Sequence, residues 1–305
     1  MDNRFTKIPC PVCTSNEYKI LYKSTLKKKD FSQEVIIKDF KNSLSDFTKH
    51  GQIVKCKKCD LVYVNPVENI SSYLSGYRDV VDDEYLCMEN FRKLLSLKHL
   101  KKLERYKKGK ELLDVGCFAG FFLELARAHK WNTFGIEPSS WASSFAKKRG
   151  TKVLGKTIEK TPLPNNYFDV ITLWDVIEHL SNPKRDIAKL SKSLKRGGII
   201  AIGTPDVESL MFKILRGHHP YFIRMHLVLF SQKTLKKLLE QNGFKIIDIY
   251  TYGRPYPLCY YLERLETKFS IFKYLRFLKK NKFINEIPIT LNLGDEFTIL
   301  AKKIR

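Results

Sequence analysis

The sequence of 305 residues lacks any long apolar run and any recognisable leader. No stretch approaches the roughly 18 consecutive apolar residues that a membrane-spanning helix needs, so we expect no transmembrane segment. The N-terminus has no apolar core of the kind that marks a signal peptide, which predicts a cytoplasmic protein. Internal repeats and low-complexity linkers are also missing.

Acidic residues are scarce relative to basic ones. The chain carries 32 Asp and Glu against 55 Lys and Arg, a formal net charge of +23. Such an excess favours anionic partners, namely nucleic acid, phosphate-bearing or nucleotide-linked molecules, or an acidic membrane surface. The alternative is a solvated, lysine-rich surface. Hydrophobic residues make up 43% and aromatic residues 12%, which excludes a disordered chain and allows one large domain with a smaller one.

Cysteine is too sparse and too clustered for a disulfide framework. Seven are present, and four of them form two CxxC pairs, Cys10 with Cys13 and Cys56 with Cys59. Four thiolates from two such turns can converge tetrahedrally on one zinc ion at about 2.3 Å. A redox CxxC would need a single pair inside a βαβ pattern, which is absent here. We therefore predict a structural zinc ribbon over residues 1–66 in a reducing compartment.

Residues 112–121 have the pattern of a strand, a tight turn and the start of a helix. The apolar strand ends at Gly116 and Gly120, and a second apolar strand, residues 133–136, ends in Glu137. A glycine turn lets a ligand approach the backbone, and the helix start offers N–H donors. A carboxylate at the neighbouring strand end can accept ribose hydroxyls. The pattern predicts a nucleoside-cofactor site on an α/β sheet.

The rest of the chain alternates strands and helices. Residues 67–108 form a linker with a basic amphipathic helix over 89–108, whose charged side is either a phosphate-binding surface or a solvated face. Residues 109–305 form the α/β domain, with a segment rich in His and aromatic residues inserted at 206–230 and a helical insertion at 255–290. We expect further strands at 152–154, 168–174, 199–203, 244–250 and 296–301, and helices at 122–128, 140–148, 183–194 and 232–241.

Six segments, in this order, resemble the class I S-adenosylmethionine-dependent methyltransferases. They are residues 112–120, 135–139, 168–171, 175–180, 195–198 and 293–297. The resemblance covers about residues 89–303. It implies a Rossmann-like seven-stranded sheet whose last strand is antiparallel, with S-adenosyl-L-methionine as cofactor. The front end is similar to the zinc-binding module found ahead of certain methyltransferases, including sugar C-methyltransferases, and the Glu-His-Leu segment is similar to the ubiquinone-pathway O-methyltransferases.

The resemblance also assigns residues to the cofactor. It places Asp114, Gly116, Cys117 and Gly120 along the methionine end, Glu137 at the ribose, Ile158 beside the adenine, and Trp174 and Asp175 after the fourth strand, at the ligand-binding edge of the sheet. One residue departs from the family pattern, because Phe118 stands where a glycine is common. Its ring either crowds the methionine moiety or packs between helix and sheet. The same residue breaks the GxGxxG fingerprint, which disfavours a nicotinamide-dinucleotide enzyme.

His179, with Glu178 beside it, is the catalytic candidate. An imidazole can take a proton from a hydroxyl or an acidic carbon as the methyl group is transferred. The alternative is that Glu178 and His179 form a hydrogen-bonded pair that only supports the site. In the ubiquinone-pathway relatives, the positions that match Asp175, Glu178 and His179 bind a divalent metal. The insertion adds three histidines, each either a base or phosphate contact or a surface or packing residue: His218, His219 and His226.

These features predict an S-adenosylmethionine-dependent methyltransferase with a structural zinc ion, acting on a small-molecule or glycan-type acceptor. An anionic acceptor, such as a nucleotide-linked sugar or a surface-polysaccharide precursor, fits the charge and the zinc-module resemblance. The alternatives are an RNA methyltransferase, although no RRM-type signature is present, and a non-catalytic binding protein. The basic, aromatic segment 260–281 is either a lid helix or a peripheral contact with an anionic membrane.

Overall fold

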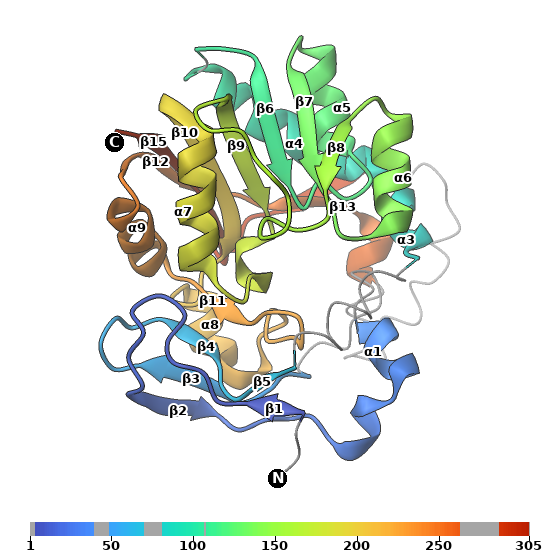
Figure 1. Ribbon diagram of the computed structural model, residues 1–305. Coiled ribbons are helices and arrows are strands. Elements are labelled where there is room, and N and C mark those ends of the chain that lie inside the picture. The colour runs from blue at the N-terminus through green and yellow to red at the C-terminus, as the bar shows by residue number, and fades with distance from the viewer. Residues whose placement is uncertain (1–3, 40–48, 70–80, 107, 263–286, 305) are drawn as a thin grey trace.

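A computed structural model describes residues 4–39, 49–69, 81–106, 108–262 and 287–304. Its centre is a seven-stranded sheet in the order β12-β15-β10-β9-β6-β7-β8 (Figure 1). Strands from β10 to β8 pair in parallel, whereas β15 runs antiparallel to both β10 and β12. The predicted sheet with an antiparallel last strand is thereby confirmed. Its strands are β6 (Glu111–Val115), β7 (Asn132–Ile136), β8 (Lys152–Gly155), β9 (Phe168–Trp174), β10 (Leu194–Pro205), β12 (Phe244–Thr251) and β15 (Glu296–Lys303).

Capping side chains begin the helices close to where the sequence predicts them. Ser139, Asn182 and Ser231 start α6, α7 and α9, and each side chain accepts a hydrogen bond from a backbone N–H three residues further on. These bonds satisfy donors that the first turn of a helix leaves unpaired. The helices around the main sheet are α4 (Glu89–Glu104), α5 (Phe121–Ala128), α6 (Ser140–Lys148), α7 (Pro183–Ser193) and α9 (Gln232–Gln241).

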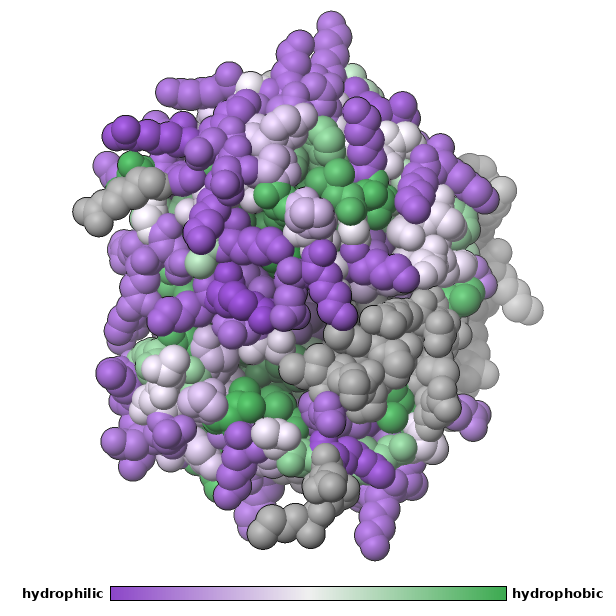
Figure 2. Space-filling view, viewed as in Figure 1, coloured by the Kyte–Doolittle hydropathy of each residue, from purple (hydrophilic) through white to green (hydrophobic). Residues whose placement is uncertain are grey.

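The helices cover both faces of the sheet. α4, α5 and α6 bury Leu100, Leu123 and Ala146 in one hydrophobic cluster, and α7 and α9 bury Leu190 and Leu238 in another. Hydrophilic side chains cover most of the surface that Figure 2 shows. No helix among the described residues is both long and apolar enough to cross a membrane.

The N-terminal module shares a sheet with the α/β domain. Its strands β2, β3 and β4 form an antiparallel sheet, to which β11, from the 206–230 insertion, adds a fourth strand beside β4 (Figure 1). Residues 1–66 alone would therefore lack one strand of this sheet, which the sequence did not reveal. The strands of the module and its partner are β1 (Phe5–Thr6), β2 (Tyr18–Tyr22), β3 (Ile53–Cys56), β4 (Val62–Val64), β5 (Val67–Glu68), which pairs with β1, and β11 (Val228–Leu229).

The insertion predicted to be helical over 255–290 is framed by strands. β13 (Arg254–Pro257) and β14 (Pro288–Leu291) pair antiparallel at its two ends, and residues 258–262, directly after β13, are helical. Residues 263–281 of the predicted lid or membrane segment lie outside the described residues. The remaining short elements are η1 (Lys28–Phe31), α1 (Gln33–Asp39), α3 (Asp83–Cys87), η2 (Ile177–His179), α8 (Leu210–Leu215) and η3 (Arg216–His218).

Candidate functional site

A cavity opens at the carboxyl ends of β6 and β9, beneath α4. Residues of α3, α4 and α5, the turn after β6, and the segment leading into β13 complete its wall. Parallel α/β sheets bind ligands at this edge. Of the predicted cofactor residues, the cavity wall contains Asp114, Gly116, Cys117, Trp174 and Asp175, and does not include Gly120, Glu137 or Ile158.

The turn after β6 has left-handed backbone at both glycines. Gly116 has a φ of +69° and Gly120 a φ of +82°. A Cβ on Gly116 would lie 2.5 Å from Val176 Cγ2, and one on Gly120 would lie 2.9 Å from Ala146 Cα. Packing therefore requires both glycines, and Gly116 in addition gives the cavity a wall of bare backbone.

Two buried carboxyl groups stand at the ends of β6 and β7. Asp114 accepts a hydrogen bond from Thr172 Oγ1 at 2.6 Å, and burial raises its pKa to about 8. Glu137 accepts hydrogen bonds from the N–H of Phe118 at 2.9 Å and of Ser139 at 2.8 Å, and burial raises its pKa to about 7. Glu137 thus ties the turn after β6 to the end of β7. Its contact with a ribose stays a prediction.

Phe118 packs among the aromatic side chains of α3 and α6. Its ring centroid lies 4.0 Å from that of Tyr85 and 5.9 Å from that of Trp141, and the ring forms part of the cavity wall. Its φ is +45°, a left-handed conformation that costs a non-glycine residue roughly 1–2 kcal/mol. The aromatic contacts offset this cost, and they place the ring beside the ligand space.

Trp174 lines the cavity at the end of β9. Its ring stacks on that of His99 with centroids 4.2 Å apart, and burial lowers the pKa of His99 to about 3, so this imidazole is neutral. Trp174 Nε1 is buried and has no hydrogen-bond partner among the described residues. An unpaired donor beside a cavity is suited to a ligand acceptor. Ile158 is buried away from this wall, in the cluster beneath α7 and α9.

Arg92 lines the cavity, whereas its sequence context predicts only the basic face of a helix. Its guanidinium carbon lies 3.4 Å from the Tyr85 ring centroid, and its buried Nε has no hydrogen-bond partner in the part of the chain that is described. Leu95, Ser96 and His99 line the cavity from the same helix. The available signal was their i, i+3, i+4 and i+7 spacing, which puts all four residues on one helix face.

A buried charge network closes the far side of the cavity. Arg254 donates to Asp175 Oδ1 at 2.6 Å and to both oxygens of Glu296, at 2.7 and 2.9 Å. Tyr221, from the insertion, donates to Glu296 as well. Burial raises the pKa of Glu296 to about 7. Burial also acts to raise the pKa of Asp175, but Arg254, together with Arg92, holds that pKa below its ordinary range. The sequence offered no signal that joined these four residues.

Glu178, His179 and His226 converge just beyond Asp175. Their potential ligand atoms all lie within 4.8 Å of one another, and the two rings meet edge to face with centroids 4.9 Å apart. Nδ1 of His179 lies 2.9 Å from the Met225 carbonyl, and Nδ1 of His226 lies 2.8 Å from the Tyr221 carbonyl. Because a carbonyl only accepts, each Nδ1 carries the proton and each Nε2 a lone pair. This set contains His226 in place of the Asp175 that the family resemblance implied as a metal ligand.

Burial sets the protonation states of these three groups. It lowers the pKa of His179, and it lowers that of His226 to about 3, so both imidazoles are neutral near pH 7. Burial, reinforced by Asp175, raises the pKa of Glu178 to about 8. Glu178 Oε2 accepts a hydrogen bond from Thr204 at 2.9 Å, and Oε1 is buried without a partner within the described ranges. The arrangement can accept a proton or hold a cation.

The other two insertion histidines stand apart from this group. His219 is buried and stacks on Phe212 with ring centroids 3.6 Å apart, and its Nε2 lies 3.8 Å from Asp295 Oδ2. His218 is exposed. His226 is thus the one insertion histidine that meets His179, and nothing in the sequence distinguished it from the other two.

The four CxxC cysteines form one compact cluster. Cys10 Sγ lies 3.5 Å from Cys59 Sγ, and Cys13 Sγ lies 3.5 Å from Cys56 Sγ. Sulfurs at the corners of a zinc tetrahedron with bonds of about 2.3 Å would lie about 3.8 Å apart. The neighbouring Cys10 thiol and burial raise the pKa of Cys59, so the cluster needs a cation to hold four thiolates. The residues therefore fit a structural zinc ion.

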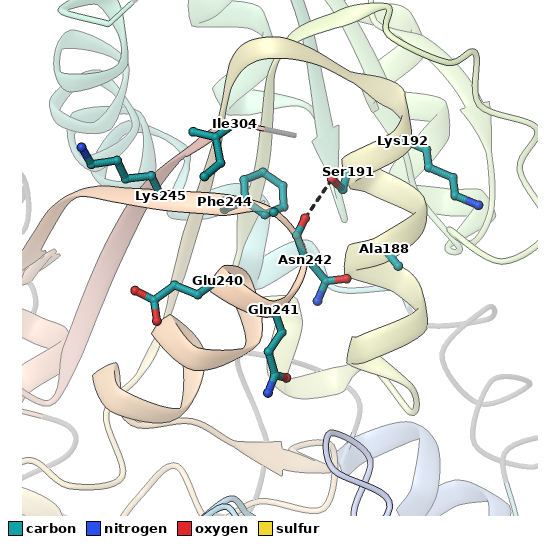
Figure 3. Close-up of a pocket in the computed structure, with 10 residues that line it drawn as sticks. Ala188, Ser191, Lys192, Glu240, Gln241, Asn242, Phe244, Lys245 and Ile304 are labelled. Atoms are coloured by element: carbon teal, nitrogen blue, oxygen red, sulfur yellow. Dashed lines mark hydrogen bonds between the residues drawn. The ribbon is translucent and has the colours of Figure 1, made fainter.

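A second hollow lies between the ends of α7 and α9, next to Ile304 (Figure 3). Ser191 donates to the Asn242 carbonyl at 3.2 Å across it, and its charged lining residues, Lys192, Glu240 and Lys245, are exposed. This hollow is a joint between two helices, remote from the end of β9.

Comparison with known proteins supports the family that the sequence resembles. A family model described as a methyltransferase domain matches residues 86–249. An uncharacterized protein of Methanocaldococcus jannaschii is 32% identical over 44% of this chain, and the ubiquinone biosynthesis O-methyltransferase of Rickettsia canadensis is 34% identical over 31% of it. The matches span 64% and 42% of those relatives' own lengths, less than two thirds in each case.

One solved structure supports the fold. A chain from the complex of the Haloferax volcanii Trm112 methyltransferase activator with a methyltransferase aligns with a TM-score of 0.50 at 14% identity, covering 73% of this chain and 95% of that one. At this level of identity the similarity concerns the fold alone.

Proposed function

The chain belongs to the class I S-adenosylmethionine-dependent methyltransferases, and from this membership we propose that it transfers a methyl group from S-adenosylmethionine to a small-molecule or glycan-type acceptor. One observation carries the proposal. The residues directly after β9 join the cavity, through Asp175, to a neutral imidazole, that of His179, whose Nε2 bears a lone pair. A cofactor space and a proton acceptor thus adjoin at the edge of the sheet where this fold binds ligands.

Bound S-adenosylmethionine would supply a sulfonium methyl group, whose carbon the acceptor nucleophile would attack in line, with S-adenosylhomocysteine as the leaving group. Arg92 is the residue that we assign to the cofactor carboxylate, because it lines the cavity and its buried Nε has no hydrogen-bond partner among the described residues. Trp174 Nε1 offers a second unused donor there. We retain the other assignments: Asp114, Gly116, Cys117 and Gly120 at the methionine end, Glu137 at the ribose, Ile158 at the adenine and Asp175 beside the methyl donor.

His179 is the group that we assign to proton removal. The Met225 carbonyl fixes the proton on Nδ1, so Nε2 accepts the proton that the acceptor loses. Glu178 is largely protonated near pH 7, its carboxyl group lies next to the imidazole, and its Oε1, which has no partner among the described residues, can donate to the acceptor. His226 meets the His179 ring and limits its rotation.

The finer identity of the acceptor rests on charge and on the front-end module. A net charge of +23 favours an anionic molecule, such as a nucleotide-linked sugar or a surface-polysaccharide precursor. Four thiols that bind zinc require a reducing compartment, which supports a cytoplasmic location.

The test combines binding with transfer. Calorimetry should detect S-adenosylhomocysteine binding to the wild-type protein. Radiolabelled cofactor should then label a nucleotide-sugar or lipid-linked glycan pool. A His179→Gln variant should bind S-adenosylhomocysteine as the wild type does, but its rate of methyl transfer should fall about 10²–10⁴-fold. If the wild-type protein does not bind S-adenosylhomocysteine, the enzyme proposal is excluded. Labelling of an RNA pool alone would replace the glycan-type acceptor with RNA.

A further inference from the structure

We infer that the zinc ribbon is part of the acceptor side of the site: it holds His226 against His179, so that loss of zinc releases His226 while the cofactor side keeps its structure. The inference rests on the proposed function, in which His179 faces the acceptor. Val64, Leu227 and Arg224 are then positioning residues, because each acts on the histidine pair through other groups.

A backbone path joins the ribbon to the turn that carries His179. β4 of the ribbon pairs with β11 of the insertion. Just before β11, the Leu227 carbonyl accepts a hydrogen bond from Val64 N at 2.9 Å, and Leu227 N donates to the Glu178 carbonyl at 2.8 Å. Leu227 therefore bridges the two parts, and His226 is its immediate neighbour. A shift of β4 would therefore move Leu227 and, with it, His226.

A buried ion-pair network anchors the same segment two residues earlier. The Arg224 guanidinium donates to both oxygens of Glu68, at distances from 2.8 to 3.0 Å, to Asp39 Oδ2 at 3.2 Å and to the Asp30 carbonyl at 2.6 Å. The Arg224 side chain is 3% exposed. All three partners belong to the N-terminal part of the chain. The chain is therefore fixed on both sides of His226 by residues outside the α/β domain: before it through Arg224, and after it through the bond from Val64 to Leu227.

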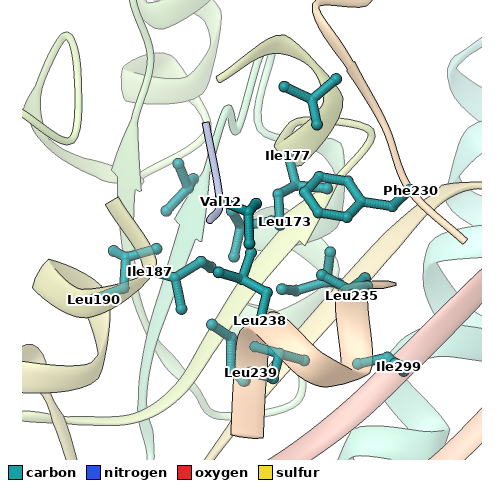
Figure 4. Close-up of a cluster of buried hydrophobic side chains, with 14 of the residues drawn as sticks. Val12, Leu173, Ile177, Ile187, Leu190, Phe230, Leu235, Leu238, Leu239 and Ile299 are labelled. Atoms are coloured by element: carbon teal, nitrogen blue, oxygen red, sulfur yellow. The ribbon is translucent and has the colours of Figure 1, made fainter. Parts of the chain in front are cut away.

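The first CxxC turn, Cys10–Cys13, packs into the core next to the turn Ile177–His179. Val12, between the first two cysteines, is 5% exposed and points into the hydrophobic cluster of the α/β domain (Figure 4). That cluster contains Ile177, which begins the turn before Glu178 and His179, and Phe230, which follows β11. Zinc fixes Val12 by cross-linking its loop to the second CxxC pair.

Most of the cofactor side belongs to different clusters, although Ile158 packs in the same cluster as Val12 and Tyr221 reaches Glu296 in the charge network. Phe118 and Phe121 pack with Tyr85 and Trp141, and Phe122 packs with Leu100 on the opposite face of the sheet from α7 and α9. Neither cluster contains a ribbon residue within the described ranges. Structural units that share few contacts open independently. Loss of zinc should therefore act locally.

The experiment compares the full-length protein with and without zinc, under reducing conditions. We measure S-adenosylhomocysteine affinity by calorimetry, amide hydrogen exchange of residues 221–230 and 112–128, and diethyl pyrocarbonate labelling of His226 by mass spectrometry. After zinc removal, exchange over 221–230 and labelling of His226 should rise about tenfold or more, with affinity changed less than about threefold. Unchanged exchange over 221–230 overturns the inference. An equal rise over 112–128 also overturns it, because zinc would then support the whole chain.

A zinc-loaded variant gives a second test. Arg224→Met cuts the buried link but keeps all four cysteines, and it should raise His226 labelling in the same way. Lys233→Met is the matched control, because Lys233 also contacts the ribbon, at 3.5 Å from Asp60, but is 73% exposed. Unchanged labelling in Arg224→Met, or an equal rise in Lys233→Met, refutes the inference. Failure of zinc-loaded wild type to bind S-adenosylhomocysteine counts against the proposed function alone, since the exchange and labelling results need no ligand.

Discussion

Replacing Arg254 with methionine should destabilise the protein in a manner that depends on pH. The side chain is 17% exposed and neutralises Glu296, which is 3% exposed, and Asp175, which is 35% exposed. Removal of one partner from a buried ion pair costs about 3–5 kcal/mol. Because Asp175 retains access to water, only the ion pair with Glu296 contributes its full energy. We therefore expect the free energy of unfolding to fall by about 3 kcal/mol near pH 8.

Protonation of Glu296 reduces this loss in acid. Its pKa is already raised to about 7, and removal of Arg254 raises it further. A carboxyl whose folded pKa exceeds its unfolded value costs stability that grows as pH rises, so the variant is penalised more in base than in acid. Near pH 5.5 Glu296 is mostly neutral, and the loss should shrink to about 1 kcal/mol of hydrogen bonding.

Thermal unfolding followed by circular dichroism measures both values. At about 2 °C per kcal/mol, the melting temperature should fall by about 6 °C near pH 8 and about 2 °C near pH 5.5. The control is Lys102→Met, which removes an ion pair of the same 2.6 Å length at the surface, where Lys102 is 29% and Asp248 27% exposed. It should cost less than about 1 kcal/mol at either pH. A loss in Arg254→Met no larger than in the control, or equal at both pH values, would refute the reasoning.

Three further substitutions and one metal analysis probe other parts of the molecule. Glu137→Gln replaces one of the two oxygens that accept backbone N–H bonds with an NH2 donor and should weaken S-adenosylhomocysteine binding about tenfold or more by calorimetry; unchanged affinity contradicts it. Arg92→Met should weaken the binding of S-adenosylhomocysteine by about 10–100-fold but leave the binding of methylthioadenosine, which lacks the carboxylate, unaffected; equal losses of affinity for the two ligands would mean a merely structural role. Val12→Ala should cost roughly 1–2 kcal/mol in urea unfolding, and a neutral result would place Val12 outside the core. Metal analysis should find about one zinc per chain, absent in Cys56→Ser.

Much of the α/β domain could be predicted from the sequence, because its signals are local. The strand at 168–174 is a nearly continuous apolar run. Ser139, Asn182 and Ser231 cap helices through hydrogen bonds to backbone N–H groups only three residues further along the chain. The two-residue strand β11 carried no such signal. Its pairing with β4 depends on partners far apart along the chain, which propensity and periodicity do not record.

The site was predictable where a motif lies within one segment. The turn with Asp114 and Gly116 and the pair Glu178 and His179 are contiguous with strand ends, and the structure places the first two on the cavity wall. Arg92 and His226 were not separable from their neighbours, because a basic helix face and an aromatic insertion contain several equivalent candidates. Packing decided which arginine lines the cavity and which histidine meets His179.

The shared sheet of the ribbon also sets an order of assembly. During synthesis β4 leaves the ribosome long before β11 exists, so one edge of the ribbon sheet stays open until the insertion arrives. An open strand edge is a template for pairing with other chains. Nascent chains that stall between β9 and β11 should therefore be the aggregation-prone population, and slow translation of that stretch should lower the yield of native protein.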